Sequence, residues 1–96
     1  MGFVVKHKLE GKRGKFYVTL NEEEALLEYE VTNNIIIAYH TFTPLNLRGK
    51  GIALAMTKAL IELAQKDGRK IRPLCSYVAN YLKNQPELST LIDNTL

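Results

Sequence analysis

The chain has 96 residues, is 46% hydrophobic and 24% charged, and carries a formal net charge of +3. This length suits a modest hydrophobic core, so we expect residues 1–96 to form a single minimal domain. The apolar run Ile35 to Tyr39 is too short to cross a bilayer, and the N-terminal MGFVVKHK lacks the apolar segment of a secretion signal. These features predict a soluble cytoplasmic protein without a membrane partner.

The first half of the chain has the composition of β-strands. The runs FVVKHKL, KFYVTL and ALLEYEV are β-prone, and they are separated by the glycine-bracketed turn GKRGK and the polar tip NEEE. After a turn at TNN, residues 35–43 (IIIAYHTFT) predict the strongest strand, which Pro44 ends. A period of two puts one set of side chains on one face of this strand, namely Ile36, Ala38, His40 and Phe42. The other face then carries Ile35, Ile37, Tyr39 and Thr41.

The second half changes to a helical period. Apolar residues recur at helical spacing from Ile52 onwards, and Gly68 is placed to end this helix in the left-handed conformation. KIRPL predicts a short strand in which Pro73 cannot donate to the ladder. CSYVANYLKNQP predicts a second, shorter helix with Ser76 as its N-cap and Pro86 after its end.

These elements predict an α/β fold in which an antiparallel meander leads into a parallel β-α-β unit, followed by a short second helix. A helix between two sequential strands of one sheet usually makes a right-handed crossover between parallel neighbours. We therefore expect Ile35–Thr43 and Lys70–Leu74 to be the parallel pair.

The stretch NLRGKGIALAM has two glycines and two cations immediately before the main helix. A helix N-terminus exposes unpaired N–H groups with a partial positive charge, and glycine lets the backbone approach a bulky anion. Arg48 and Lys50 add full charges, so the stretch predicts a phosphate-binding loop. A glycine-rich turn with incidental cations is the alternative. The spacing matches neither a Walker P-loop nor a dinucleotide fingerprint.

The segment Arg48-Gly49-Lys50-Gly51-Ile52-Ala53 resembles the acyl-coenzyme A signature of the GNAT acetyltransferase superfamily. That signature is Arg or Gln, two residues, Gly, one residue, and Gly or Ala, and this chain matches all three defined positions. His40 before the loop and Cys75-Ser76 after the next strand resemble the small single-domain branch of the superfamily. The resemblance covers residues 15–81.

The resemblance implies a GNAT-like mixed sheet and acetyl-coenzyme A as the acyl-donor cosubstrate, with no metal. In this superfamily the loop amides hold the coenzyme A pyrophosphate, and the pantetheine arm lies where the two parallel strands splay apart. Pro73 would suit such a splay because it removes one ladder donor. The residues expected to bind the cosubstrate are Phe42, Thr43, Leu47, Arg48, Gly49, Lys50, Gly51, Ile52, Ala53 and Ser76.

Cys75 and His40 are the candidate catalytic residues. Cys75, the only cysteine, falls at a strand end and a helix start, where the helix dipole stabilises a thiolate. Two routes stay open. In one, Cys75 forms an acyl-enzyme assisted by His40; in the other, His40 deprotonates the acceptor amine and Cys75 only lines the cleft. Tyr81 is either a core residue or, by the resemblance, the acid for the departing thiolate.

We thus expect an acetyltransferase that acts on an amine acceptor, either a small molecule or a protein. A non-enzymatic coenzyme A-binding sensor or partner protein is the alternative. A third hypothesis is a basic adaptor that acts through the cations between Lys6 and Lys15, with binding that is sensitive to salt. The run has no interleaved aromatic residues and no known reader motif, which argues against nucleic acid.

Overall fold

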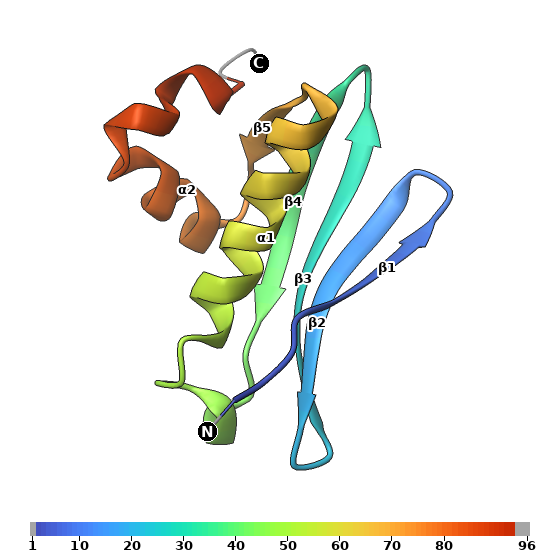
Figure 1. The fold of residues 1–96 in the computed structure, drawn as a ribbon, viewed down its shortest axis with the longest axis vertical. Coiled ribbons are helices and arrows are strands. Elements are labelled where there is room, and N and C mark those ends of the chain that lie inside the picture. Colours follow the sequence, from blue (N-terminus) through green and yellow to red (C-terminus); the bar gives the residue numbers. More distant parts are fainter. Residues whose placement is uncertain (1, 94–96) are drawn as a thin grey trace.

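The computed structural model describes residues 2–93. Along the chain lie β1 (Lys6–Glu10), β2 (Arg13–Leu20), β3 (Glu23–Thr32), β4 (Ile35–Phe42), the 3-10 turn η1 (Leu45–Leu47), α1 (Ile52–Asp67), β5 (Lys70–Pro73), α2 (Ser76–Lys83) and the 3-10 segment η2 (Pro86–Leu91). The strands form a sheet in the order β1-β2-β3-β4-β5 (Figure 1). Neighbours are antiparallel except β4 and β5, which are parallel. This topology confirms the predicted fold class.

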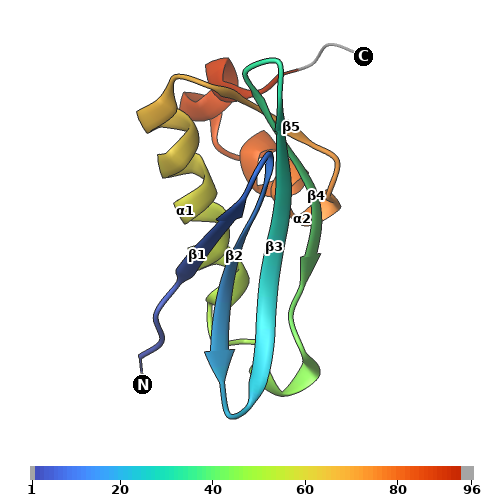
Figure 2. The same ribbon diagram turned by 90° about the vertical axis from the view of Figure 1, so that its right-hand side faces the viewer.

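Helix α1 covers one face of the sheet (Figure 2). Alternate residues of the strands point beneath it and are buried, as the period of two requires. Burying one large apolar side chain stabilises the fold by about 1.5–3 kcal/mol. The largest fully buried side chains of this core include Leu27, Tyr29, Ile36, Ile71, Met56 and Leu60. No helix within residues 2–93 is long and apolar enough to span a membrane.

The turns and caps of the fold follow from residues that tolerate positive φ. Gly68 ends α1 with φ 66°, as predicted, and its amide bonds to the carbonyl oxygen of Gln65 at 3.3 Å. Asn33 and Asn34 turn the chain between β3 and β4 with φ of 51° and 67°. Both residue types adopt the left-handed region at low cost. The two turns therefore fix the lengths of the neighbouring elements.

Several predicted boundaries are wrong by one to three residues. β1 begins at Lys6 rather than at residue 3, because its pairing with β2 starts there. Cys75, not Ser76, is the N-cap of α2. The Cys75 backbone is extended and its carbonyl oxygen accepts the Ala79 amide at 3.0 Å. In the described residues no side chain bonds to this helix start, so the usual preference for serine had no effect here.

A β-bulge interrupts the pairing of β3 with β4. Tyr29 pairs with Ala38, whereas the preceding residue, Glu28, pairs with His40, so Tyr39 is the extra residue. Antiparallel partners lie on the same face of a sheet. His40 therefore shares a face with Glu28, away from α1, and Ala38 shares the buried face with Tyr29.

This bulge corrects the predicted faces of β4. The period of two placed His40 and Phe42 on the face of Ala38, but the extra residue moves both to the opposite face. Thr41 moves the other way and lies on the α1 side. The prediction was wrong because a bulge depends on the partner strand, which the local pattern of β4 does not report.

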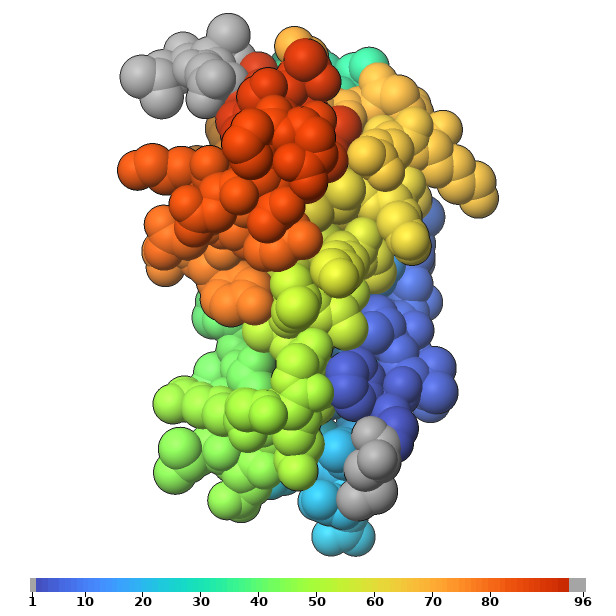
Figure 3. All heavy atoms as spheres, turned by 60° about the vertical axis from the view of Figure 1, so that its left-hand side comes forward, coloured from blue at the N-terminus to red at the C-terminus, as the bar shows by residue number. Residues whose placement is uncertain are grey.

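The C-terminal segments lie beyond the β5 edge of the sheet (Figure 1). Ile92 forms a parallel bridge with Ile71, and the Asp93 amide bonds to the Ile71 carbonyl oxygen at 2.8 Å. Arg72 also donates from Nε to Oδ2 of Asp93 at 2.9 Å. These contacts hold η2 beside the parallel pair, at the far end of the molecule from the loop between β4 and α1 (Figure 3).

Candidate functional site

Two glycines shape the loop before α1. Gly49 and Gly51 both have φ of 80°, and Gly51 is the N-cap of the helix. A side chain in this region costs roughly 1–2 kcal/mol. A Cβ added at either position would meet no described atom within 4 Å. The requirement for glycine is therefore conformational, and the space in front of the loop is open to a ligand.

The first turn of α1 presents backbone donors at this loop. The Ala55 amide makes the first helical bond, to the Gly51 carbonyl oxygen at 3.0 Å, so the amides of Ile52, Ala53 and Leu54 precede it. Within residues 2–93 no side chain caps this helix start. The helix dipole adds a partial positive charge here. These amides form a site that suits an anion.

Arg48 ties the loop to the end of β4. Its Nε donates to the Thr43 carbonyl oxygen at 3.0 Å, and the side chain is exposed. Lys50 is also exposed and adds a second cation beside the helix start. Both cations therefore add positive charge near the start of α1.

A cavity of about 380 Å³ opens between the end of β4, the glycine loop and the start of α2. Its size lies within the usual range for small-molecule sites. In Figure 3 the green loop and the orange start of α2 flank a hollow. Eight of the ten predicted binding residues line it: Phe42, Thr43, Leu47, Arg48, Gly49, Gly51, Ile52 and Ala53. Lys50 and Ser76 are exposed and are not part of its wall in the described chain.

The two parallel strands separate next to this cavity. Their pairing ends at Ala38 and Pro73, while β4 continues to Phe42. The amides of Leu74 and Cys75 both donate to the Ala38 carbonyl oxygen, at 2.9 and 3.0 Å, as the chain turns away. The last four residues of β4 thus have no β5 partner in the described structure. An extended ligand with amide groups can pair with such a free strand edge.

Cys75 lies at this opening and is half-buried. Its Sγ is 2.8 Å from Oγ1 of Thr41. The bulge explains this partner, because it turns Thr41 toward the α1 side and His40 away from it. No hydrogen bond joins His40 to Cys75 among residues 2–93. Sequence reasoning missed Thr41, and only knowledge of the bulge would have identified it.

His40 lies on the open face of the sheet. Its side chain is exposed, and Glu28 is its cross-strand partner. Side chains at such paired positions have Cβ atoms about 4.5–5.5 Å apart. His40 and Glu28 therefore share the face of the sheet that points away from α1.

Tyr77, rather than Tyr81, lines the cavity. Burial raises the pKa of the Tyr77 phenol, and the neighbouring Tyr81 raises it further. Tyr77 is therefore a neutral hydrogen-bond donor at pH 7. Tyr81 is half-buried and packs against the core. Sequence reasoning considered Tyr81 because of the resemblance to larger members of the superfamily, and it missed the tyrosine one helical turn earlier.

A mixed sheet whose parallel strands separate beside a glycine-loop helix defines the GNAT class of fold. A family model described as GCN5-related N-acetyl-transferase matches residues 15–91. A solution NMR structure from Staphylococcus aureus, described as a "GCN5-like putative N-acetyltransferase", superposes with a TM-score of 0.66. That protein is 26% identical, and the match covers 95% of this chain and 90% of that one.

Vertebrate proteins are also similar to this chain. Protein NATD1 of Gallus gallus is 36% identical over 78 residues, covering 78% of this chain and 71% of the relative. Protein NATD1 of Homo sapiens is 32% identical over 88 residues, covering 88% and 78%. The chain belongs to the GCN5-related N-acetyltransferase family, as the resemblance in its sequence predicted. Acetyl-coenzyme A is the typical acyl donor of that family.

Proposed function

We propose that this protein binds acetyl-coenzyme A in the cavity before α1 and transfers its acetyl group to an amine. The observation that carries the proposal is the cavity of about 380 Å³ bounded by unpaired first-turn amides and a left-handed glycine N-cap. A diphosphate would accept hydrogen bonds from the amides of Ile52, Ala53 and Leu54. Arg48 and Lys50 would balance its charge.

The separated strands supply a path for the rest of the donor. The pantetheine arm carries amide groups, which would pair with the free edge of β4 over residues 39–42. Following that edge leads the thioester from the glycine loop toward Thr41 and Cys75. Tyr77 lines the same cavity and would face the sulfur end of the donor.

The geometry favours direct transfer over an acyl-cysteine. His40 and Cys75 lie on opposite sides of β4, so His40 is better placed as the base for an incoming amine. The ammonium group would lose a proton to His40, and its nitrogen would then bond to the thioester carbonyl carbon. As the C–S bond breaks, the thiolate would take a proton from the Tyr77 phenol, which solvent would replace. The second amine proton leaves with solvent, and Cys75 lines the cleft.

The acyl-cysteine route remains a prediction, and protein mass distinguishes it from direct transfer. In that route the Cys75 sulfur would attack the thioester and hold the acetyl group until the amine displaced it. Intact mass spectrometry after incubation with acetyl-coenzyme A would then find an acetyl adduct on Cys75. Direct transfer leaves the protein mass unchanged.

Calorimetric titration with coenzyme A, followed by a thiol-release assay with a panel of amines, tests the proposed function. Saturable binding at one site together with amine-dependent thiol release would support it. Binding without transfer to any amine would favour the non-enzymatic coenzyme A binder. Absence of binding would overturn both hypotheses.

We also propose that residues 1–96 act as one minimal acetyltransferase domain. The family match extends from residue 15 to residue 91, and the strands it includes share one core with α1. Limited proteolysis that leaves the chain intact under native conditions would support this organisation, and release of a stable fragment would contradict it.

A further inference from the structure

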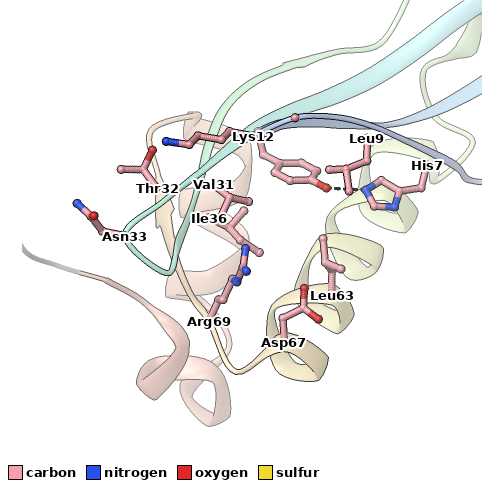
Figure 4. Close-up of a pocket in the computed structure, with 12 residues that line it drawn as sticks. His7, Leu9, Lys12, Val31, Thr32, Asn33, Ile36, Leu63, Asp67 and Arg69 are labelled. Atoms are coloured by element: carbon pink, nitrogen blue, oxygen red, sulfur yellow. Dashed lines mark hydrogen bonds between the residues drawn. The ribbon is translucent and has the colours of Figure 1, made fainter.

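A second cavity, of about 450 Å³, lies at the opposite end of α1 from the glycine loop (Figure 4). Four apolar side chains form part of its wall: Leu9, Val31, Ile36 and Leu63. Helix α1 has 16 residues and is therefore about 24 Å long. This cavity is thus separate from the proposed coenzyme A site.

Arg69 extends its guanidinium group into this second cavity (Figure 4). Its Nε is buried and has no hydrogen-bond partner among residues 2–93. A buried donor without an acceptor costs about 1–3 kcal/mol, and more when it is charged. Such an atom is a sign of a missing water, ion or ligand. A guanidinium group binds a carboxylate through two parallel hydrogen bonds.

Asp67 points into the same cavity from the last turn of α1 (Figure 4). The carbonyl end of a helix has a partial negative charge, so a carboxylate there disfavours the helix and attracts a cation. Asp67 and Arg69 form no ion pair within 4.0 Å in the part of the chain that the structure describes. The opposite charges of Asp67 and Arg69 therefore line one cavity without neutralising each other, and Lys12 adds a second cation to its wall.

Tyr29 and His7 also belong to the polar part of the wall. The Tyr29 hydroxyl lies 2.6 Å from Nε2 of His7. Burial lowers the pKa of His7, so its ring is neutral at pH 7. Burial raises the pKa of Tyr29, Asp67 raises it further, and Arg69 partly offsets them. Both charged groups thus act on one phenol, which agrees with their position around one cavity.

We propose that this cavity binds a free α-amino acid with an apolar side chain. The carboxylate would pair with Arg69, the ammonium group would pair with Asp67, and the side chain would pack on the apolar wall. A phosphate group fits less well, because a second negative charge would face Asp67. The proposal concerns a site outside the acetyl-transfer cavity and does not depend on the proposed function.

Titration by ¹H–¹⁵N NMR with L-leucine tests the proposal. The matched probes are 4-methylpentanoate, which lacks the amine, and 3-methylbutylamine, which lacks the carboxylate. We expect leucine to shift the amides around Arg69 saturably, and each probe to bind at least about tenfold more weakly. Equal binding of either probe, or no saturable shift with leucine, would overturn the proposal.

Two variants separate the roles of the charges. Arg69→Gln and Asp67→Asn should each raise the Kd for leucine at least about tenfold, since each removes one charged partner. Lys66→Gln is the matched control, because Lys66 is an exposed α1 residue outside the cavity. Asp67 is exposed, so Asp67→Asn tests the site even if Arg69→Gln fails to fold. Unchanged leucine binding in Asp67→Asn would contradict the proposal.

Coenzyme A binding serves as the independent readout. Both variants should keep the coenzyme A affinity of the wild-type chain, because their side chains are remote from the glycine loop. A parallel loss of leucine and coenzyme A binding in Asp67→Asn, a change at an exposed residue, would contradict the separation of the two sites.

Discussion

Position 14 needs a glycine because the Tyr29 side chain packs directly against its backbone. Tyr29 is buried, and its ring stacks near Phe16 and His7. A Cβ at Gly14 would overlap ring atoms and the hydroxyl oxygen of Tyr29. The phenol could shift only by giving up its contacts with these rings and its hydrogen bond to His7. Gly14 is therefore a packing residue, although its φ is ordinary.

Gly14→Ala should lower the free energy of unfolding by about 1–3 kcal/mol, the usual cost of overpacking. Urea denaturation followed by circular dichroism measures it. Gly2→Ala is the control, since a Cβ there meets no described atom within 4 Å, and it should change stability by less than about 0.5 kcal/mol. Equal stability of the two variants would contradict the packing described here.

His7 makes stability depend on pH. Its pKa in the folded chain is lowered by burial from the ordinary value of 6.5, so the unfolded chain binds more protons near that pH. The contribution of His7 to the free energy of unfolding is therefore complete above about pH 6.5. It is lost as the pH falls toward the lower pKa of the folded chain. Stability should decrease between pH 7.5 and pH 5.5 in urea titrations. His7→Gln should flatten that part of the profile; an unchanged profile would exclude His7 as the cause.

The two catalytic candidates should differ in their effect on transfer. His40→Gln should lower kcat/KM by roughly 10²–10⁴, the usual contribution of a general base. Cys75→Ala should lower it by less than about tenfold if the cysteine only lines the cleft. Steady-state kinetics with the best amine acceptor measures both. An equally large loss in Cys75→Ala would favour the acyl-cysteine route.

Helix α1 has a glycine with positive φ at each end. Gly51 and Gly68 have φ of 80° and 66°, and a Cβ at either would meet no described atom within 4 Å. Gly51→Ala and Gly68→Ala should therefore both cost roughly 1–2 kcal/mol of stability. Only Gly51→Ala should also weaken coenzyme A binding, because Gly51 shapes the loop at the helix start. Urea denaturation measures the stability of the two variants, and calorimetry measures their coenzyme A affinity. An equal loss of coenzyme A affinity in both variants would contradict the role of the loop.

The elements of this fold were predictable because they depend on local patterns. The helical spacing after Ile52, the stop at Gly68 and the turn at Asn33 are all read from neighbouring residues, and each was confirmed. The bulge at Tyr39 depends on the pairing of two strands, so the face of His40 was not predictable. For the same reason, the contact between Thr41 and Cys75 could not be predicted from the sequence.

The distribution of charge over the whole molecule weakens the basic-adaptor hypothesis. Lys15 donates to Oε2 of Glu24 at 2.7 Å, and this hydrogen bond raises the pKa of Lys15. Nε of Arg13 lies 3.9 Å from Oε1 of Glu30. These two cations of β2 thus lie beside carboxylates of the neighbouring strand β3, which partly neutralise the charge of the basic run. Arg48, beside the glycine loop, instead lines a cavity.

The fold places two cavities at opposite ends of one helix, and within residues 2–93 it leaves one sheet face without a helix. The central claim concerns the first cavity: the amides at the start of α1 bind the diphosphate of coenzyme A. A ¹H–¹⁵N NMR titration with coenzyme A tests it most directly. We expect the amides of residues 49–54 to shift most and to saturate with one equivalent. No saturable shift, or largest shifts in another part of the sheet or helix, would contradict the account.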